Sequence, residues 1–164
     1  MAQSHHSGHS PAPDAHRQAP ADHYRSLLGM AVLSYVAMYV LMYAMVDTPG
    51  NVFNNINQVY MAALMASPML LIELVLMRAM YPNRRLNLVL AVGAVIVMLL
   101  CWFGIRQQAG VSDRQFVRSM IPHHAGALLM CRENRLTDPE LQQLCREIIA
   151  SQEREIGLMK SKLE

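Results

Sequence analysis

Three long apolar segments constrain this chain more than any other feature of its sequence. They cover residues 27–45, 59–77 and 86–105, and Glu73 is the only charged residue within them. Each has about 20 residues, which lets a helix cross the roughly 30 Å hydrocarbon core of a bilayer. A soluble helix buries one face and keeps the other polar. The three segments therefore predict three transmembrane helices.

The composition supports a membrane protein and argues against other classes. Charged residues make up 16% of the chain, below the roughly 25% of soluble domains. The net charge is only +2 and aromatic residues make up 6%, so a basic, aromatic-rich surface for nucleic acid is not expected. Membrane lipid is the expected surrounding, with no nucleic-acid partner.

The arginines near the predicted spans indicate an orientation. Positive residues are retained on the cytoplasmic side of a membrane. Five arginines flank the N-terminal side and the second loop: Arg17, Arg25, Arg78, Arg84 and Arg85. Three follow the last span, namely Arg106, Arg114 and Arg118. The balance predicts a cytoplasmic N-terminus and an exported C-terminal segment, which in a bacterial inner membrane would be periplasmic.

Residues 1–26 form a polar leader with too little apolar content to fold alone. Five of the seven histidines of the chain lie here: His5, His6, His9, His16 and His23. Such a histidine-rich leader can collect metal ions loosely. It can equally serve only as a soluble extension.

Residues 106–164 predict a helical hairpin, with helices at about 113–133 and 139–163. Two capping-box patterns mark the helix starts, Ser112 with Gln115 and Thr137 with Glu140. Pro139 then falls in the first turn of the second helix.

Metal-binding side chains recur at helical spacing along both helices of this hairpin. On the first helix they are Met120, His123, His124, Met130 and Cys131, and on the second Cys145, Gln152, Glu155 and Met159. If the helices pack antiparallel through these faces, the side chains converge. Thioether and thiolate sulfur favour Cu(I), whereas imidazole also binds Cu(II) and Zn(II). The set therefore favours copper, with zinc or another transition metal as the alternative.

Simpler interpretations compete with a metal site. The methionines at this spacing can be core residues, and Cys131 and Cys145 can form a disulfide if the segment is exported. Methionines also recur along the predicted spans, at Met38, Met42 and Met45 and then at Met61, Met65, Met69 and Met77. Packing or lipid contact is the expected role of these membrane methionines, with metal conduction as the alternative.

The hairpin resembles the MIPHH signature of the bacterial domain-of-unknown-function 305 family. The matching residues are Phe116, Met120, Ile121, Pro122, His123, His124, Ala127 and Met130, then Asp138, Pro139, Glu140, Leu141, Gln152, Glu155, Ile156 and Met159. The resemblance implies a ferritin-like helical bundle and an association with copper binding or metal tolerance. Leu129 replaces an acidic residue of many members and Lys162 a common tryptophan. The first departure argues against a carboxylate-rich iron site.

We therefore expect an all-α protein with three transmembrane helices and a ferritin-like hairpin that completes a four-helix bundle by homodimerisation. Its expected function is to bind, buffer or hand over copper at the periplasmic face of the inner membrane. A metal-dependent redox enzyme and a structural membrane-interaction protein are the alternatives. The sequence shows no Ser–His–Asp order, phosphate loop or carboxylate-rich di-metal motif.

Overall fold

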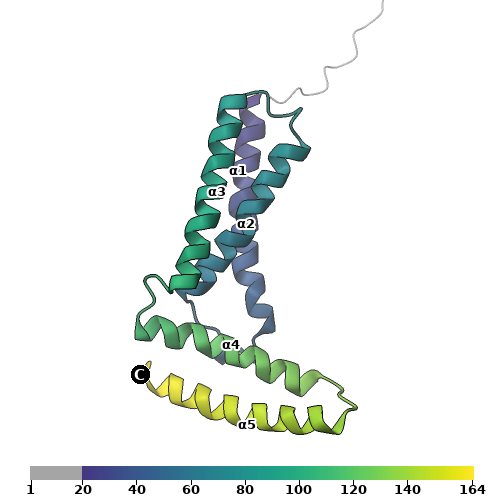
Figure 1. Ribbon diagram of the computed structural model, residues 1–164, viewed down its shortest axis with the longest axis vertical. Helices are drawn as coiled ribbons and strands as arrows, with labels where there is room; N and C mark the ends of the chain where they lie inside the picture. The colour runs from purple at the N-terminus through teal and green to yellow at the C-terminus, as the bar shows by residue number, and fades with distance from the viewer. Residues whose placement is uncertain (1–19) are drawn as a thin grey trace, which may run out of the picture.

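The computed structural model describes residues 20–164 and consists there of helices and their connections, so the all-α expectation is confirmed (Figure 1). The long helices are α1 (Pro20–Leu41), α2 (Ile56–Leu76), α3 (Arg84–Gln107), α4 (Asp113–Glu133) and α5 (Pro139–Ser161). Two short 3₁₀ helices, η1 (Met42–Met45) and η2 (Pro49–Asn51), follow α1. Of the leader's histidines only His23 lies within the described residues, in α1.

The first three helices are long and apolar enough to cross a membrane, as their sequences predict. Each is slightly longer than the apolar segment from which it was predicted, except that the last four residues of the first span form η1. Side-chain caps explain two of the starts, because Asn55 accepts a hydrogen bond from the N–H of Gln58 and Asn83 from that of Leu86.

The membrane bundle is built on α2, which packs against both α1 and α3. Gly104 allows α3 to approach closely, since a Cβ there would lie 3.2 Å from the ring of Tyr60. At the opposite end of the bundle, Tyr24 donates a hydrogen bond to the side chain of Asn87 at 2.8 Å. Glu73 is the one charged residue of the three apolar segments. It also lies toward that end, where the Tyr81 hydroxyl donates a hydrogen bond to its carboxylate.

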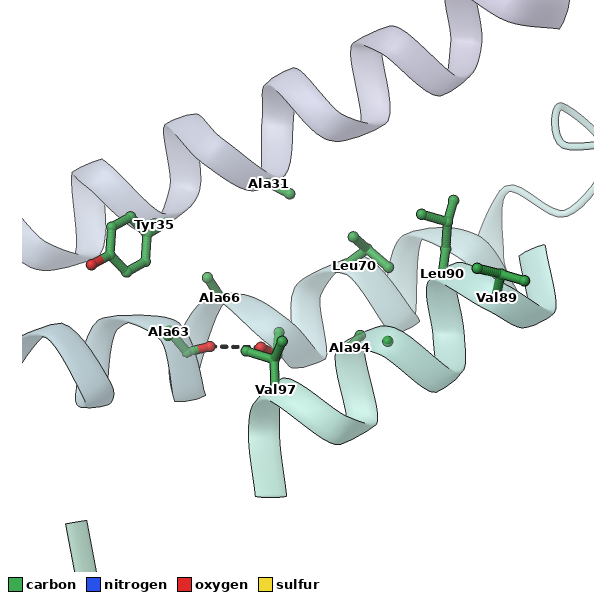
Figure 2. Close-up of a pocket in the computed structure, with 11 residues that line it drawn as sticks. Ala31, Tyr35, Ala63, Ala66, Leu70, Val89, Leu90, Ala94 and Val97 are labelled. Atoms are coloured by element: carbon green, nitrogen blue, oxygen red, sulfur yellow. Dashed lines mark hydrogen bonds between the residues drawn. The ribbon is translucent and has the colours of Figure 1, made fainter. Parts of the chain in front are cut away.

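An apolar cavity of about 470 Å³ lies among the three spans (Figure 2). Its walls are mostly alanine and branched aliphatic side chains from α1, α2 and α3, and Tyr35 lies at one end. The Ser67 hydroxyl in its wall donates to the carbonyl of Ala63 within the same helix. The cavity thus presents little polar chemistry.

The hairpin of α4 and α5 crosses the end of the membrane bundle, with α4 between the bundle and α5 (Figure 1). It is connected to the bundle by a tight turn after α3, in which Gln108 and Gly110 have positive φ angles of 51° and 71°. The hairpin therefore lies at the end of the bundle where α1 ends and α2 begins.

Candidate metal site

The hairpin has a small apolar core formed by Ile121, Ala125, Leu128 and Ile156. Val46 and Phe53, from the connection between α1 and α2, pack against this core. A disulfide joins Cys131 near the end of α4 to Cys145 in α5, with 5.2 Å between their Cα atoms. These contacts fix α4 relative to both α5 and the membrane bundle.

Neither predicted capping box forms. Ser112 precedes α4, but its side chain makes no capping hydrogen bond. Gln115 instead accepts a hydrogen bond from the N–H of Ile56 at 3.1 Å, so tertiary contact replaces the local pattern. At the second helix, Asp138 rather than Thr137 is the N-cap, and its carboxylate accepts from the N–H groups of Glu140 and Leu141. A carboxylate is the stronger acceptor for these N–H groups.

His124 is buried between the two helices of the hairpin, with both ring nitrogens paired. Its Nδ1 lies 2.8 Å from the carbonyl oxygen of Met120. Its Nε2 lies 2.7 Å from Oε2 of Glu155. The other Glu155 oxygen accepts from the Ser151 hydroxyl at 2.7 Å. Which ring nitrogen donates depends on the tautomer of the imidazole.

The surroundings of Glu155 favour its ionised form. The hydrogen bond from Ser151, followed by that from His124, lowers the pKa of this carboxyl below its ordinary value. The Glu155 side chain is nevertheless 48% exposed to solvent. The pair therefore links a buried imidazole to a carboxylate at the surface of the hairpin.

Met120, His123 and Met130 line a different space from the one that His124 occupies. They line a cavity of about 590 Å³ between the hairpin and the adjoining end of the membrane bundle. His123 is exposed, and Met130 is 53% exposed. The two imidazole rings remain neighbours, with 5.9 Å between their centroids. We call this space the seam cavity.

The arrangement differs from the single cluster expected from helical spacing. Successive residues on a helix point about 100° apart, so His123 and His124 cannot both face α5. Met159 packs against the hairpin core. Gln152 is half-buried on α5, and the two cysteines are joined to one another. The predicted donors are thus divided among the seam cavity, the His124–Glu155 pair and separate positions along the hairpin. The last group consists of Met159, Gln152 and the two cysteines.

Within residues 20–164, no three His, Cys, Asp or Glu side chains converge closely enough to hold a metal ion between them. The seam cavity offers another kind of donor, since its lining combines thioethers with the His123 imidazole and no carboxylate. Asn57 also lines it, and the Oδ1 atom of this residue is buried without a hydrogen-bond partner. Thioether and imidazole ligands suit Cu(I) and do not suit hard cations.

Residues of the membrane bundle also line the seam cavity. Met42 and Met45 of η1 and Met61 of α2 do so. The sequence predicts packing, or alternatively metal conduction, for these methionines and does not predict a place beside the hairpin. The one sequence feature that could have identified them is their position near the span ends that face the hairpin.

Comparison with known proteins places the hairpin in a recognised group. Residues 105–163 match the family model described as Domain of unknown function (DUF305). The chain is 33% identical over 141 residues to Uncharacterized protein L153 of Acanthamoeba polyphaga mimivirus, an alignment that covers 84% of this chain and 91% of the relative. That similarity therefore extends into the membrane bundle. No solved structure matches the chain.

Proposed function

We propose that this chain, which belongs to the family defined by the domain of unknown function DUF305, is a membrane-anchored copper-binding protein. Its hairpin would bind Cu(I) through Met120, His123 and Met130. The observation that carries the proposal is the convergence of these three side chains on the seam cavity.

The chemistry of the donors supports Cu(I) over other metal ions. Neutral thioethers are soft ligands, and imidazole is a borderline one. No carboxylate of residues 20–164 lines the cavity, so a divalent hard cation would gain little compensation there for losing its water. Zinc is also less suited, because protein zinc sites use Cys, His and carboxylate ligands rather than thioethers.

His124 and Glu155 form a second candidate set of ligands beside this cavity. The Nδ1 atom of His124 is paired with a backbone carbonyl, which is how many metal-bound histidines are oriented. Its Nε2 is paired with Glu155. We assign this pair primarily to holding α4 against α5, with its exchange for a metal as a secondary use.

Binding and hand-over fit this site better than catalysis does. His123 is exposed and Met130 is 53% exposed, so both can be reached from solvent at the end of the membrane bundle. The thioethers can release a soft ion to a partner that presents stronger thiolate ligands. We therefore propose a role in buffering or transferring copper.

We further propose that the hairpin lies on the exported side of the membrane, the periplasm in the case of a bacterial inner membrane. The arginine distribution favours this direction. The Cys131–Cys145 disulfide supports it independently, because disulfides persist mainly in oxidising compartments.

A homodimer is the assembly that we propose for the hairpin. Leu141, Leu144 and Leu158 occupy one side of α5 and are 47%, 50% and 63% exposed. Glu155 lies within the same stripe by helical spacing. A second hairpin packed on this side would form a four-helix bundle and bury the leucines.

The proposed function is tested by measuring Cu(I) affinity of the full-length protein in detergent, under anaerobic conditions, by competition with a chromophoric chelator. We expect tighter binding of Cu(I) than of Zn(II), and weaker Cu(I) binding after Met120→Leu combined with Met130→Leu. Volume-conserving Met-to-Leu changes remove the sulfur while preserving packing. Absence of Cu(I) binding by the unmodified protein would refute the proposal.

A further inference from the structure

Five of the fourteen methionines of the chain line the seam cavity, and they come from both parts of the molecule. Met120 and Met130 belong to α4 of the hairpin. Met42 and Met45 lie in η1, and Met61 lies in the second turn of α2. Chain segments far apart in sequence thus present the same functional group to one space.

The membrane methionines are divided by their position along the spans. Met61 and Met65 lie one helical turn apart on α2 and are almost equally exposed, at 42% and 43%. Only Met61 lines the seam cavity. Met38, Met65 and Met69 lie farther from the hairpin on the first two spans and do not line the cavity. Lipid contact alone does not distinguish the two groups, whereas proximity to the hairpin does.

The hairpin is fixed over this end of the bundle by several contacts. Gly126 of α4 approaches η1 so closely that a Cβ there would lie 3.5 Å from the carbonyl oxygen of Met45. Asn57 of α2 donates to the Ser119 hydroxyl of α4 at 3.3 Å. Asp47, two residues after the end of η1, pairs with Arg132 of α4 at 3.1 Å. These contacts hold α4 against η1 and the start of α2, and methionines of all three line the same cavity.

We propose that Met42, Met45 and Met61 join Met120, His123 and Met130 in one set of donors from which a Cu(I) ion takes its few ligands, so that one ion is shared between the membrane bundle and the hairpin. This inference rests on the proposed copper-binding function and adds ligands that lie outside the DUF305 match, which begins at residue 105. A soft monovalent ion suits a cavity whose ligands are neutral thioethers and one imidazole. Binding then stabilises the docked arrangement, because the ion contacts both parts only when they are together.

The test compares two triple variants of the full-length protein in detergent. The first carries Met42→Leu, Met45→Leu and Met61→Leu, and the control carries Met38→Leu, Met65→Leu and Met69→Leu. Both lose three sulfur atoms from the first two membrane spans with little change in side-chain volume. Circular dichroism and gel filtration confirm that each variant keeps its helices and its size.

We expect the first triple variant to bind Cu(I) at least about tenfold more weakly than the unmodified protein, a change of about 1.4 kcal/mol. The control should keep its affinity. X-ray absorption at the copper edge supplies an independent measurement, because the first variant should show fewer sulfur ligands than the control.

Two outcomes would overturn the shared site. Equal affinity and an equal number of sulfur ligands in the two triple variants would confine copper to the hairpin and leave the proposed function standing. An equal loss of affinity in both would point to a general effect of the membrane methionines rather than to the seam cavity. Failure of the unmodified protein to bind Cu(I) would refute the copper-binding function itself. The unmodified protein thus tests the function, whereas the comparison of the two triple variants tests the shared site.

Discussion

Asp47 and Arg132 form an ion pair that joins the connection after α1 to α4 of the hairpin, with 3.1 Å between Oδ2 and Nη1. The Asp47 side chain is only 6% exposed, and its other oxygen accepts from Thr48 and Asn51. Arg132 also contacts Glu153 of α5. One guanidinium therefore links the membrane bundle to both helices of the hairpin.

Replacing Arg132 by Gln is expected to loosen the docking of the hairpin on the membrane bundle. The change leaves a buried carboxylate without its charged partner, at a cost of about 1.5–3 kcal/mol. Limited proteolysis within residues 108–112 should become faster, because the connection opens more often. Arg135→Gln is the control, since Arg135 is exposed near the same end of the hairpin. Equal proteolysis rates in the two variants would contradict a docking role for the ion pair.

The two adjacent histidines are expected to behave differently when each is replaced by Ala. His123 is exposed at the seam cavity, so His123→Ala should weaken Cu(I) binding and leave the melting temperature nearly unchanged. His124 is buried and paired at both nitrogens. His124→Ala should therefore destabilise the hairpin by about 1–3 kcal/mol, because polar partners are left unsatisfied. Chelator competition and thermal unfolding separate the two effects, and the reverse pattern would exchange the assigned roles.

The disulfide makes a prediction about both stability and membrane sidedness. Cys131 and Cys145 are separated by 14 residues, so loss of the bond through Cys131→Ser with Cys145→Ser should cost about 3 kcal/mol. In cells, both thiols should resist a membrane-permeant alkylating reagent until a reductant is added. Rapid alkylation without reductant would place the hairpin in a reducing compartment and reverse the proposed orientation. Cys101, which is buried in α3, supplies an internal reference for a free thiol in the denatured protein.

Acid is expected to destabilise the hairpin through Glu155. The folded state holds the pKa of this carboxyl below its ordinary value, so its contribution is present above the ordinary pKa and is lost as pH falls through the lowered one. The melting temperature of the metal-free protein should therefore fall as the pH drops below about 4.5. Glu155→Gln should flatten this acid dependence, whereas Glu133→Gln should preserve it. An identical acid dependence in the two variants would remove Glu155 from the explanation.

The proposed dimer is expected to depend on the exposed leucines of α5. Leu144→Gln with Leu158→Gln should shift the detergent-solubilised protein from dimer to monomer, because the buried apolar area of the interface is lost. Arg146→Gln, on the opposite side of α5 from Leu144, is the control. Light scattering with and without Cu(I) provides the mass. A monomeric unmodified protein that still binds Cu(I) would reject the dimer and leave a site within one chain.

The helices of this fold could be predicted from the sequence because local patterns of apolar and capping residues define them. The long apolar runs, which contain Glu73 as their one charged residue, define the membrane spans. The hairpin helices begin at Asp113 and Pro139 as predicted. The capping residues were predicted less well, since Gln115 is used by the N–H of Ile56, far away in sequence. Local patterns do not reveal such competition from tertiary contacts.

The site was predictable in its donors but not in their arrangement. Helical spacing predicts that His123 and His124 lie on one broad side of α4. Because adjacent residues point about 100° apart, the two side chains can still contact different parts of the protein. Which neighbour each histidine meets depends on how the hairpin docks, and the tight turn at Gln108 and Gly110 determines that. For the same reason, Met42, Met45 and Met61 could not be distinguished from the other membrane methionines before the docking was known.

That tight turn also makes the hairpin sensitive to the bilayer. It connects α3 directly to α4, while η1 and the start of α2 also line the seam cavity. Membrane helices change their tilt when the hydrocarbon thickness changes. We therefore expect the width of the seam cavity to depend on lipid composition and to differ between detergent micelles and thick, sterol-rich vesicles.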